Sequence, residues 1–198
     1  VSGWSPDTVG VRFGKSGSDV TTAAVRLARA VTGNQGVLSC GYHGWGSWSI
    51  AKTKPAWGID DREQHLVIDM GFGEVPIGGL PVLYMDKWDE SLVDEAKKLI
   101  RSYTGYYSPV MAALPGGVSL EFLKAKIACV IVEQPAYDPP EQWYTELRKF
   151  CDEHGCLLVM DEVVTGLRYA PGGASEKYGI QPDLVCMGKA LGNGAAIS

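Results

Sequence analysis

The stretch 156-CLLVMDE-162 decides the fold class, because an unbroken apolar run ends there directly in two carboxylates. A run that is apolar at successive positions, instead of at alternate ones, is typical of a strand that is buried on both faces. Two more runs, 129-CVIV-132 and 184-LVCM-187, have the same character. Strands of this kind predict a mostly parallel sheet that is covered by helices on both sides.

Amphipathic segments supply the helices that such a sheet needs. Residues 20–31 repeat apolar side chains at helical spacing and end at Gly33, and a second helix is predicted from Pro139-Pro140 to Gly155. Their inward faces are Ala24, Leu27, Ala28 and Val31 in the first helix and Trp143, Leu147, Phe150 and Cys151 in the second. The other predicted elements are strands at 9–13 and 37–40, a helix at 86–102 and a short helix around Glu176. The expected architecture is a three-layer α/β/α fold.

Composition places the chain among folded proteins and argues against several partners. Of its 198 residues, 45% are hydrophobic and 21% are charged, which predicts a buried core. The net charge is −5, so nucleic acid and anionic membrane surfaces are poor partners. No apolar run approaches the roughly 20 residues that span a bilayer, and the start of the sequence, VSGWSPDTVG, has no signal-peptide pattern. We expect a cytoplasmic protein.

The five cysteines lack the spacing of a disulfide framework or a metal site. Three of them lie inside apolar runs, which predicts reduced, buried thiols. A zinc site built from Cys151, His154 and Cys156 is the alternative, but the sequence offers no fourth ligand at a suitable spacing. No metal site is predicted.

Polar residues follow the predicted strands at the places where a parallel sheet binds ligands, beyond the carboxyl ends of its strands. The turn 16-SGSD-19 opens the first helix, Asp161 ends an apolar strand, and Lys189 follows the last strand. A Gly- and Ser-rich turn at a helix start presents free N–H groups that suit a phosphate. The alternative is simple capping by Ser16 or Ser18. Neither a P-loop nor a dinucleotide-binding fingerprint is present.

Asp161 and Lys189 each have a chemical interpretation and a structural one. A buried carboxylate needs a cation or hydrogen-bond donors, which a protonated heterocyclic nitrogen would provide; a helix cap or an ion pair with Arg168 is the alternative. Lys189 lies among Met187, Gly188 and Ala190 with no other charge nearby. Removal from water would favour its neutral amine, a nucleophile that forms a Schiff base with a carbonyl, whereas a solvated lysine in a glycine-rich loop is the alternative.

The loop 41-GYHGWG-46 also permits two interpretations. Tyr42 and His43 either stack on a planar ligand or pack with Trp45 and Trp48. Together, a phosphate cup, an aromatic platform, a buried carboxylate and a reactive lysine match the needs of pyridoxal 5'-phosphate. This cofactor has a phosphate tail, a flat ring, a pyridine nitrogen and an aldehyde.

Five segments carry a resemblance to a known family: 12-RFGKSGSDVTTAAVRLARAVTG-33, 41-GYHG-44, 130-VIVE-133, 161-DEVVTGLR-168 and 182-PDLVCMGKALGNG-194. In this order, and with 28 residues from Asp161 to Lys189, they resemble the class III pyridoxal-phosphate aminotransferases, including glutamate-1-semialdehyde 2,1-aminomutase and its relatives. The resemblance implies that Lys189 forms the Schiff base and that Asp161 pairs with the pyridine nitrogen. It further implies that Val163 and Tyr42 cover opposite ring faces and that Gly17 and Ser18 hold the phosphate.

The resemblance also implies a fold-type I enzyme that transfers amino groups between small molecules, with Lys189 as its catalytic residue. Residues 1–198 would be a partial large domain, with an amino-terminal segment and a carboxyl-terminal small domain outside this sequence, and the full-length form would be a homodimer. Asp19 and the segment 134-QPAYDPPE-141 depart from the family pattern, and the apolar Val164 favours an aminomutase. Another pyridoxal-phosphate reaction on the same fold, or a non-catalytic fragment or pseudoenzyme, remains the alternative.

Overall fold

A five-stranded parallel sheet forms the centre of the protein in the computed structural model, which describes residues 10–51, 58–60, 66–69, 74–77, 80–83, 127–134 and 142–198. The strand order is β2 (Val67–Asp69), β1 (Gly36–Cys40), β5 (Ile127–Glu133), β6 (Leu157–Glu162) and β7 (Leu184–Met187), and each neighbouring pair is parallel. The described helices are α1 (Gly17–Thr32), α2 (Ser47–Ile50), α5 (Gln142–His154) and α6 (Gly173–Lys177), with a 3₁₀ turn, η3 (Lys189–Gly192). Strands β3 (Glu74–Ile77) and β4 (Leu80–Leu83) form a separate antiparallel pair.

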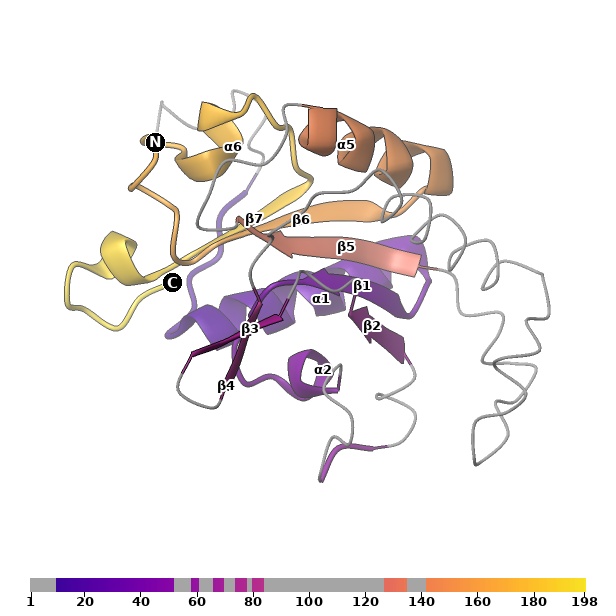
Figure 1. The fold of residues 1–198 in the computed structure, drawn as a ribbon, viewed down its shortest axis with the longest axis horizontal. Coiled ribbons are helices and arrows are strands. Elements are labelled where there is room, and N and C mark those ends of the chain that lie inside the picture. Colours follow the sequence, from indigo (N-terminus) through magenta and orange to yellow (C-terminus); the bar gives the residue numbers. More distant parts are fainter. Residues whose placement is uncertain are drawn as a thin grey trace.

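Helices cover both faces of this sheet (Figure 1). Helix α1 packs on one face, and α5 and α6 pack on the other. Alternate residues of β5 enter the two resulting cores: Val130 and Val132 join the core under α5, whereas Cys129 and Ile131 join the core under α1. These observations confirm the predicted three-layer α/β/α fold and explain why the strand is apolar at every position.

Most of the predicted elements are confirmed, with shifted boundaries. The predicted inward face of the first helix is wrong at Leu27 and Val31, which are 49% and 65% exposed, because the buried face of α1 consists of Thr21, Ala24, Val25 and Ala28. Strand β7 has the predicted bounds, and β6 continues through the two carboxylates after residue 160. The strand predicted at 9–13 is wrong for residues 10–13, which have no regular structure. Directly after this segment, Gly14 exchanges two backbone hydrogen bonds with Ser198, at 2.6 and 2.9 Å. The helix predicted at 86–102 lies outside the described residues.

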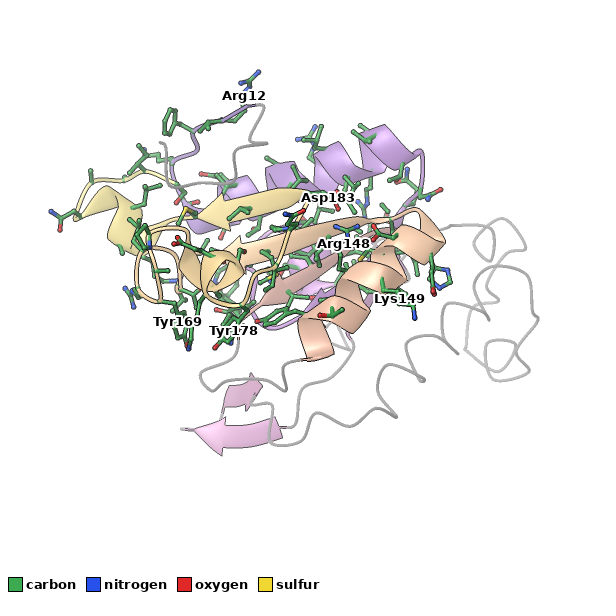
Figure 2. The ribbon with its side chains drawn as sticks, turned by 90° about the horizontal axis from the view of Figure 1, so that it is seen from above. Arg12, Arg148, Lys149, Tyr169, Tyr178 and Asp183 are labelled. Atoms are coloured by element: carbon green, nitrogen blue, oxygen red, sulfur yellow. The ribbon has the colours of Figure 1, made fainter. Side chains whose placement is uncertain are left out.

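An ion pair ties α5 to the start of β7 on the face opposite α1 (Figure 2). Arg148 Nη1 lies 2.8 Å from Asp183 Oδ2, and the same carboxylate oxygen accepts a 2.7 Å hydrogen bond from the Leu158 N–H of β6. Asp183 therefore links a helix and two strands. This contact stabilises the fold at the amino-terminal end of β7, which is the end of the strand opposite Lys189.

The five cysteines are buried and none is joined in a disulfide, as predicted. Burial raises the pKa of Cys129 to about 12, and it also raises the pKa of Cys186. Within the described ranges, no group of three or more His, Cys, Asp or Glu side chains is placed to hold a metal ion. No helix in the part of the chain that the structure describes is long and apolar enough to cross a membrane.

Candidate functional site

The carboxyl ends of the central strands bring the predicted site residues to one edge of the sheet. Glu133 at the end of β5 pairs in register with Asp161 of β6, and Glu162 pairs with Met187, which ends β7 directly before Gly188-Lys189. Residues far apart in the sequence thus meet at the edge where ligands bind in parallel sheets.

Asp161 has a specific partner in this structure. Its carboxylate is 2% exposed; Oδ2 lies 2.7 Å from His43 Nδ1, and Oδ1 accepts a 3.1 Å hydrogen bond from the Val163 N–H. The partner of the Asp161 carboxylate is therefore His43, and the ion pair with Arg168 that was the structural alternative is not formed. Glu162 points to the opposite face, as expected for a continuing strand, and accepts hydrogen bonds from the main chain of Ala174 and Ser175.

His43 is the site residue whose contact with Asp161 was not predicted from the sequence. It is 1% exposed, and its ring stacks on Trp48 with a centroid distance of 5.8 Å. The Trp48 indole N–H donates to Thr22 Oγ1 at 3.1 Å, and Thr21 Oγ1 donates to the His43 carbonyl at 2.8 Å. Both contacts anchor His43 to α1. The loop was predicted either to stack on a ligand or to pack with tryptophans, and His43 does the second while it holds Asp161.

Tyr42, in contrast, presents its side chain to solvent. Tyr42 is 59% exposed, whereas the next residue, His43, is buried. The Tyr42 backbone N–H donates a 2.9 Å hydrogen bond to Glu133 Oε2. The ring is therefore available to a planar ligand while its main chain is fixed to β5.

The hydrogen bonds at the start of α1 show which serine caps the helix. Ser16 makes the reciprocal capping box: its Oγ accepts from the Asp19 N–H at 3.3 Å, and Asp19 Oδ2 accepts from the Ser16 N–H at 2.9 Å. Ser18 is not the cap. Its Oγ accepts the Trp45 N–H at 3.1 Å, which leaves the hydroxyl proton to donate elsewhere. The N–H groups of the first turn, which include those of Gly17 and Ser18, have no partner within an α-helix.

Glycines bring these segments into close contact. A Cβ atom on Gly17 would lie 2.9 Å from Val163 Cγ1, and one on Gly188 would lie 3.3 Å from the same methyl group. A Cβ atom on Gly44 would collide with Ser18 Oγ. Val163 therefore lies between the start of α1 and the residue before Lys189.

Lys189 begins η3 directly after β7 and has a positive φ of 45°. Non-glycine residues in this region carry backbone strain, which in folded proteins concentrates at functional sites. Of the two interpretations of Lys189, the structure favours the solvated lysine in a glycine-rich loop, because Lys189 is exposed. Its neighbours within the sequence are small and glycine-rich, so they shape the backbone without covering the amine.

The profile of the class III aminotransferase family matches residues 5–198. The chain belongs to this family. It is 34% identical over 201 aligned positions to a glutamate-1-semialdehyde 2,1-aminomutase of Salinibacter ruber, covering 97% of this chain and 39% of that protein. It is 32% identical over 195 positions to the 2'-deamino-2'-hydroxyneamine transaminase of Streptomyces kanamyceticus, covering 98% of this chain and 39% of the relative.

A solved structure shows the same fold. An omega-transaminase from Sphaerobacter thermophilus superposes with a TM-score of 0.68 at 21% identity, covering 97% of this chain and 40% of that one. The chain thus spans about two fifths of the length of the proteins it matches. The fold-type I architecture predicted from the sequence is confirmed.

Proposed function

We propose that this protein binds pyridoxal 5'-phosphate and catalyses amino-group transfer, as an aminotransferase or as an aminomutase similar to glutamate-1-semialdehyde 2,1-aminomutase. Lys189 is the residue that bonds covalently to the cofactor. The observation that carries the proposal is the buried Asp161–His43 pair at the sheet edge from which Lys189 also projects. Membership of the class III aminotransferases supports it.

The described residues fit this cofactor in three places. Asp161 uses one contact on each carboxylate oxygen, so each oxygen keeps a lone pair for a ring N–H. Gly17, Ser18 and the positive end of α1 suit the phosphate. Tyr42, which is exposed, and Val163, which lies between Gly17 and Gly188, would cover opposite faces of the ring.

When bound, the cofactor supplies an electron sink that stabilises negative charge on the substrate carbon. Each residue then has a separate task. Asp161 holds a proton on the ring nitrogen, since a buried carboxylate favours a cationic neighbour. His43 donates through Nδ1 and keeps Asp161 in that orientation. Tyr42 and Val163 exclude water from the ring faces, and Lys189 Nζ moves the proton at the substrate carbon.

The choice between aminotransferase and aminomutase rests on few residues. The apolar Val164 favours an aminomutase, whereas the two relatives, one named for each activity, are almost equally similar. We further propose that residues 1–198 are a partial large domain, that the full-length protein is a cytoplasmic homodimer, and that its substrates are small amino donors and acceptors. Five buried thiols, none of them in a disulfide, support a reducing compartment.

Absorbance spectroscopy of the full-length protein, reconstituted with pyridoxal 5'-phosphate, tests the function. We expect a visible band that Lys189→Ala abolishes and that a panel of amino donors bleaches at different rates. Conversion of an amino aldehyde into its isomer, without release of amine, would identify an aminomutase. A band that no amine bleaches would favour a pseudoenzyme, and identical bands in both variants would refute the proposal.

A further inference from the structure

Glu133 is a carboxylate at the candidate site to which neither the family resemblance nor the proposed chemistry assigns a role. It ends β5 and lies in register with Asp161 on β6. On its other side, Val132 pairs with Cys40, so the next residues along both strands, Glu133 and Gly41, are neighbours. Glu133 therefore stands between Asp161 and the turn that carries Tyr42.

Glu133 accepts a hydrogen bond from the main chain of this turn. Its Oε2 accepts the Tyr42 N–H at 2.9 Å. Burial raises the pKa of Glu133, and the Tyr42 hydrogen bond acts in the opposite direction. A partly buried carboxylate loses some of its hydration, and the hydrogen bond from the Tyr42 N–H replaces part of the water that Glu133 has lost.

The turn is also shaped to receive this carboxylate. Gly41 has a φ of 99°, which L-residues rarely adopt. A Cβ atom at Gly41 would lie 2.6 Å from the Glu133 Cβ and 3.0 Å from its Oε2. Two independent features, a hydrogen bond and a steric fit, thus connect Glu133 to the segment that presents the exposed Tyr42 ring.

We propose that Glu133 is a positioning residue of the cofactor site, which acts through the Tyr42 main chain and holds the Tyr42 ring against the cofactor. The inference rests on the proposed function for the identity of the ligand. This role requires that the Glu133 side chain is long enough for its oxygen to reach the Tyr42 N–H, and it does not require the negative charge. This distinguishes it from a catalytic base or from a charge that influences Lys189.

Two substitutions separate reach from charge. Glu133→Gln keeps an acceptor oxygen at the same distance and removes the charge. Glu133→Asp keeps the charge and shortens the side chain by one carbon–carbon bond of about 1.5 Å, which takes the acceptor to roughly 4 Å from the Tyr42 nitrogen, beyond hydrogen-bond range. Glu176→Asp is the matched control, because Glu176 also accepts a backbone N–H, from Gly172 at 2.5 Å, outside the site.

The measurement is the affinity of the full-length protein for pyridoxal 5'-phosphate. We expect Glu133→Asp to weaken it about tenfold, Glu133→Gln by no more than about threefold, and Glu176→Asp not at all. In a Tyr42→Ala background, Glu133→Asp should add less than about a twofold effect, because the route through Tyr42 has been removed. An equal loss in that background, or the reverse order of the two Glu133 variants, would overturn the inference. Near-normal affinity with lost turnover in Glu133→Gln would also overturn it, in favour of a catalytic base.

Deuterium exchange at segment 41–44 in the cofactor-free protein provides a second measurement. We expect faster exchange at the Tyr42 amide in Glu133→Asp than in Glu133→Gln. If the wild-type protein fails to bind the cofactor, the proposed function is refuted. The comparison of exchange rates in Glu133→Asp and Glu133→Gln still shows whether Glu133 holds the turn, because it needs no cofactor. Equal exchange in both variants would refute that role.

Discussion

Replacement of Asp161 by asparagine tests the chemistry most selectively, because the structure predicts that the shape of the site survives. The asparagine carbonyl oxygen could still accept the Val163 N–H. Its amide group could donate to His43 Nδ1 in the other ring tautomer. Only the negative charge is lost. We therefore expect Asp161→Asn to fold and to bind the cofactor.

The expected loss of rate follows from the burial of this carboxylate. Asp161 is 2% exposed, so its charge is poorly screened by water. Removing one partner of a buried ion pair costs about 3–5 kcal/mol. If that interaction stabilises the transition state, the rate of amino-group transfer should fall by about 10² to 10⁴-fold.

The assay is stopped-flow absorbance of the cofactor-loaded, full-length protein mixed with its best amino donor. Asp183→Asn is the matched control, since Asp183 also accepts a backbone N–H but lies at the other end of β7. His43→Phe, which keeps a ring beside Trp48, should slow the reaction by about 10- to 10²-fold, as for a hydrogen bond to a charged group. It should add little in the Asp161→Asn background. A near-normal rate in Asp161→Asn would refute the reasoning and show Asp161 to be structural.

Ser18, Cys129 and Glu133 each give a further prediction. Ser18→Ala should weaken the affinity for pyridoxal 5'-phosphate by about tenfold to a hundredfold. The rate constant of the cofactor-loaded form should change less, because the phosphate does not react. An unchanged dissociation constant in a fluorescence titration would mean that Ser18 only accepts the Trp45 N–H. Burial raises the pKa of Cys129 to about 12, so this thiol should resist alkylation at pH 7 in the native protein and react after denaturation. Peptide mapping of the alkylated protein measures this. Rapid labelling of Cys129 in the native protein would contradict its burial. Because burial raises the pKa of Glu133 above 4.5, ionisation of this residue destabilises the fold, and Glu133→Gln should raise the melting temperature at pH 7. The gain should shrink as the pH falls below the raised pKa of Glu133 and be absent below pH 4.5, where both states are protonated. A gain that persists below that pH would not arise from ionisation.

The sheet was largely predictable because its strands are short, apolar and separated by glycine or proline. Strand β7 matches its predicted bounds, and β6 is longer because its two terminal carboxylates both have internal partners. Hydrophobicity cannot reveal such partners. The segment at residues 10–13 alternates like a strand, yet the hydrogen bonds of Gly14 go to Ser198, far away in the sequence.

The site was predictable in position and less so in detail. The places of Asp161 and Lys189 follow from the rule that ligands bind at the carboxyl ends of parallel strands. The role of His43 did not follow, because its contact with Asp161 spans 118 residues of sequence. The SGSD turn contains two serines that could cap the helix, and only the hydrogen bonds show that Ser16 does so. The sequence also left open whether Lys189 is solvated or removed from water, since a glycine-rich apolar sequence does not determine what covers a side chain, and the structure shows Lys189 exposed.

The most direct test of the central claim is to reduce the cofactor-loaded, full-length protein with borohydride and to map the labelled peptide. We predict that the label is found on Lys189, in the peptide that follows β7, and that Lys189→Ala yields no labelled peptide. Label on any other lysine, or a wild-type protein that acquires none, would contradict the account.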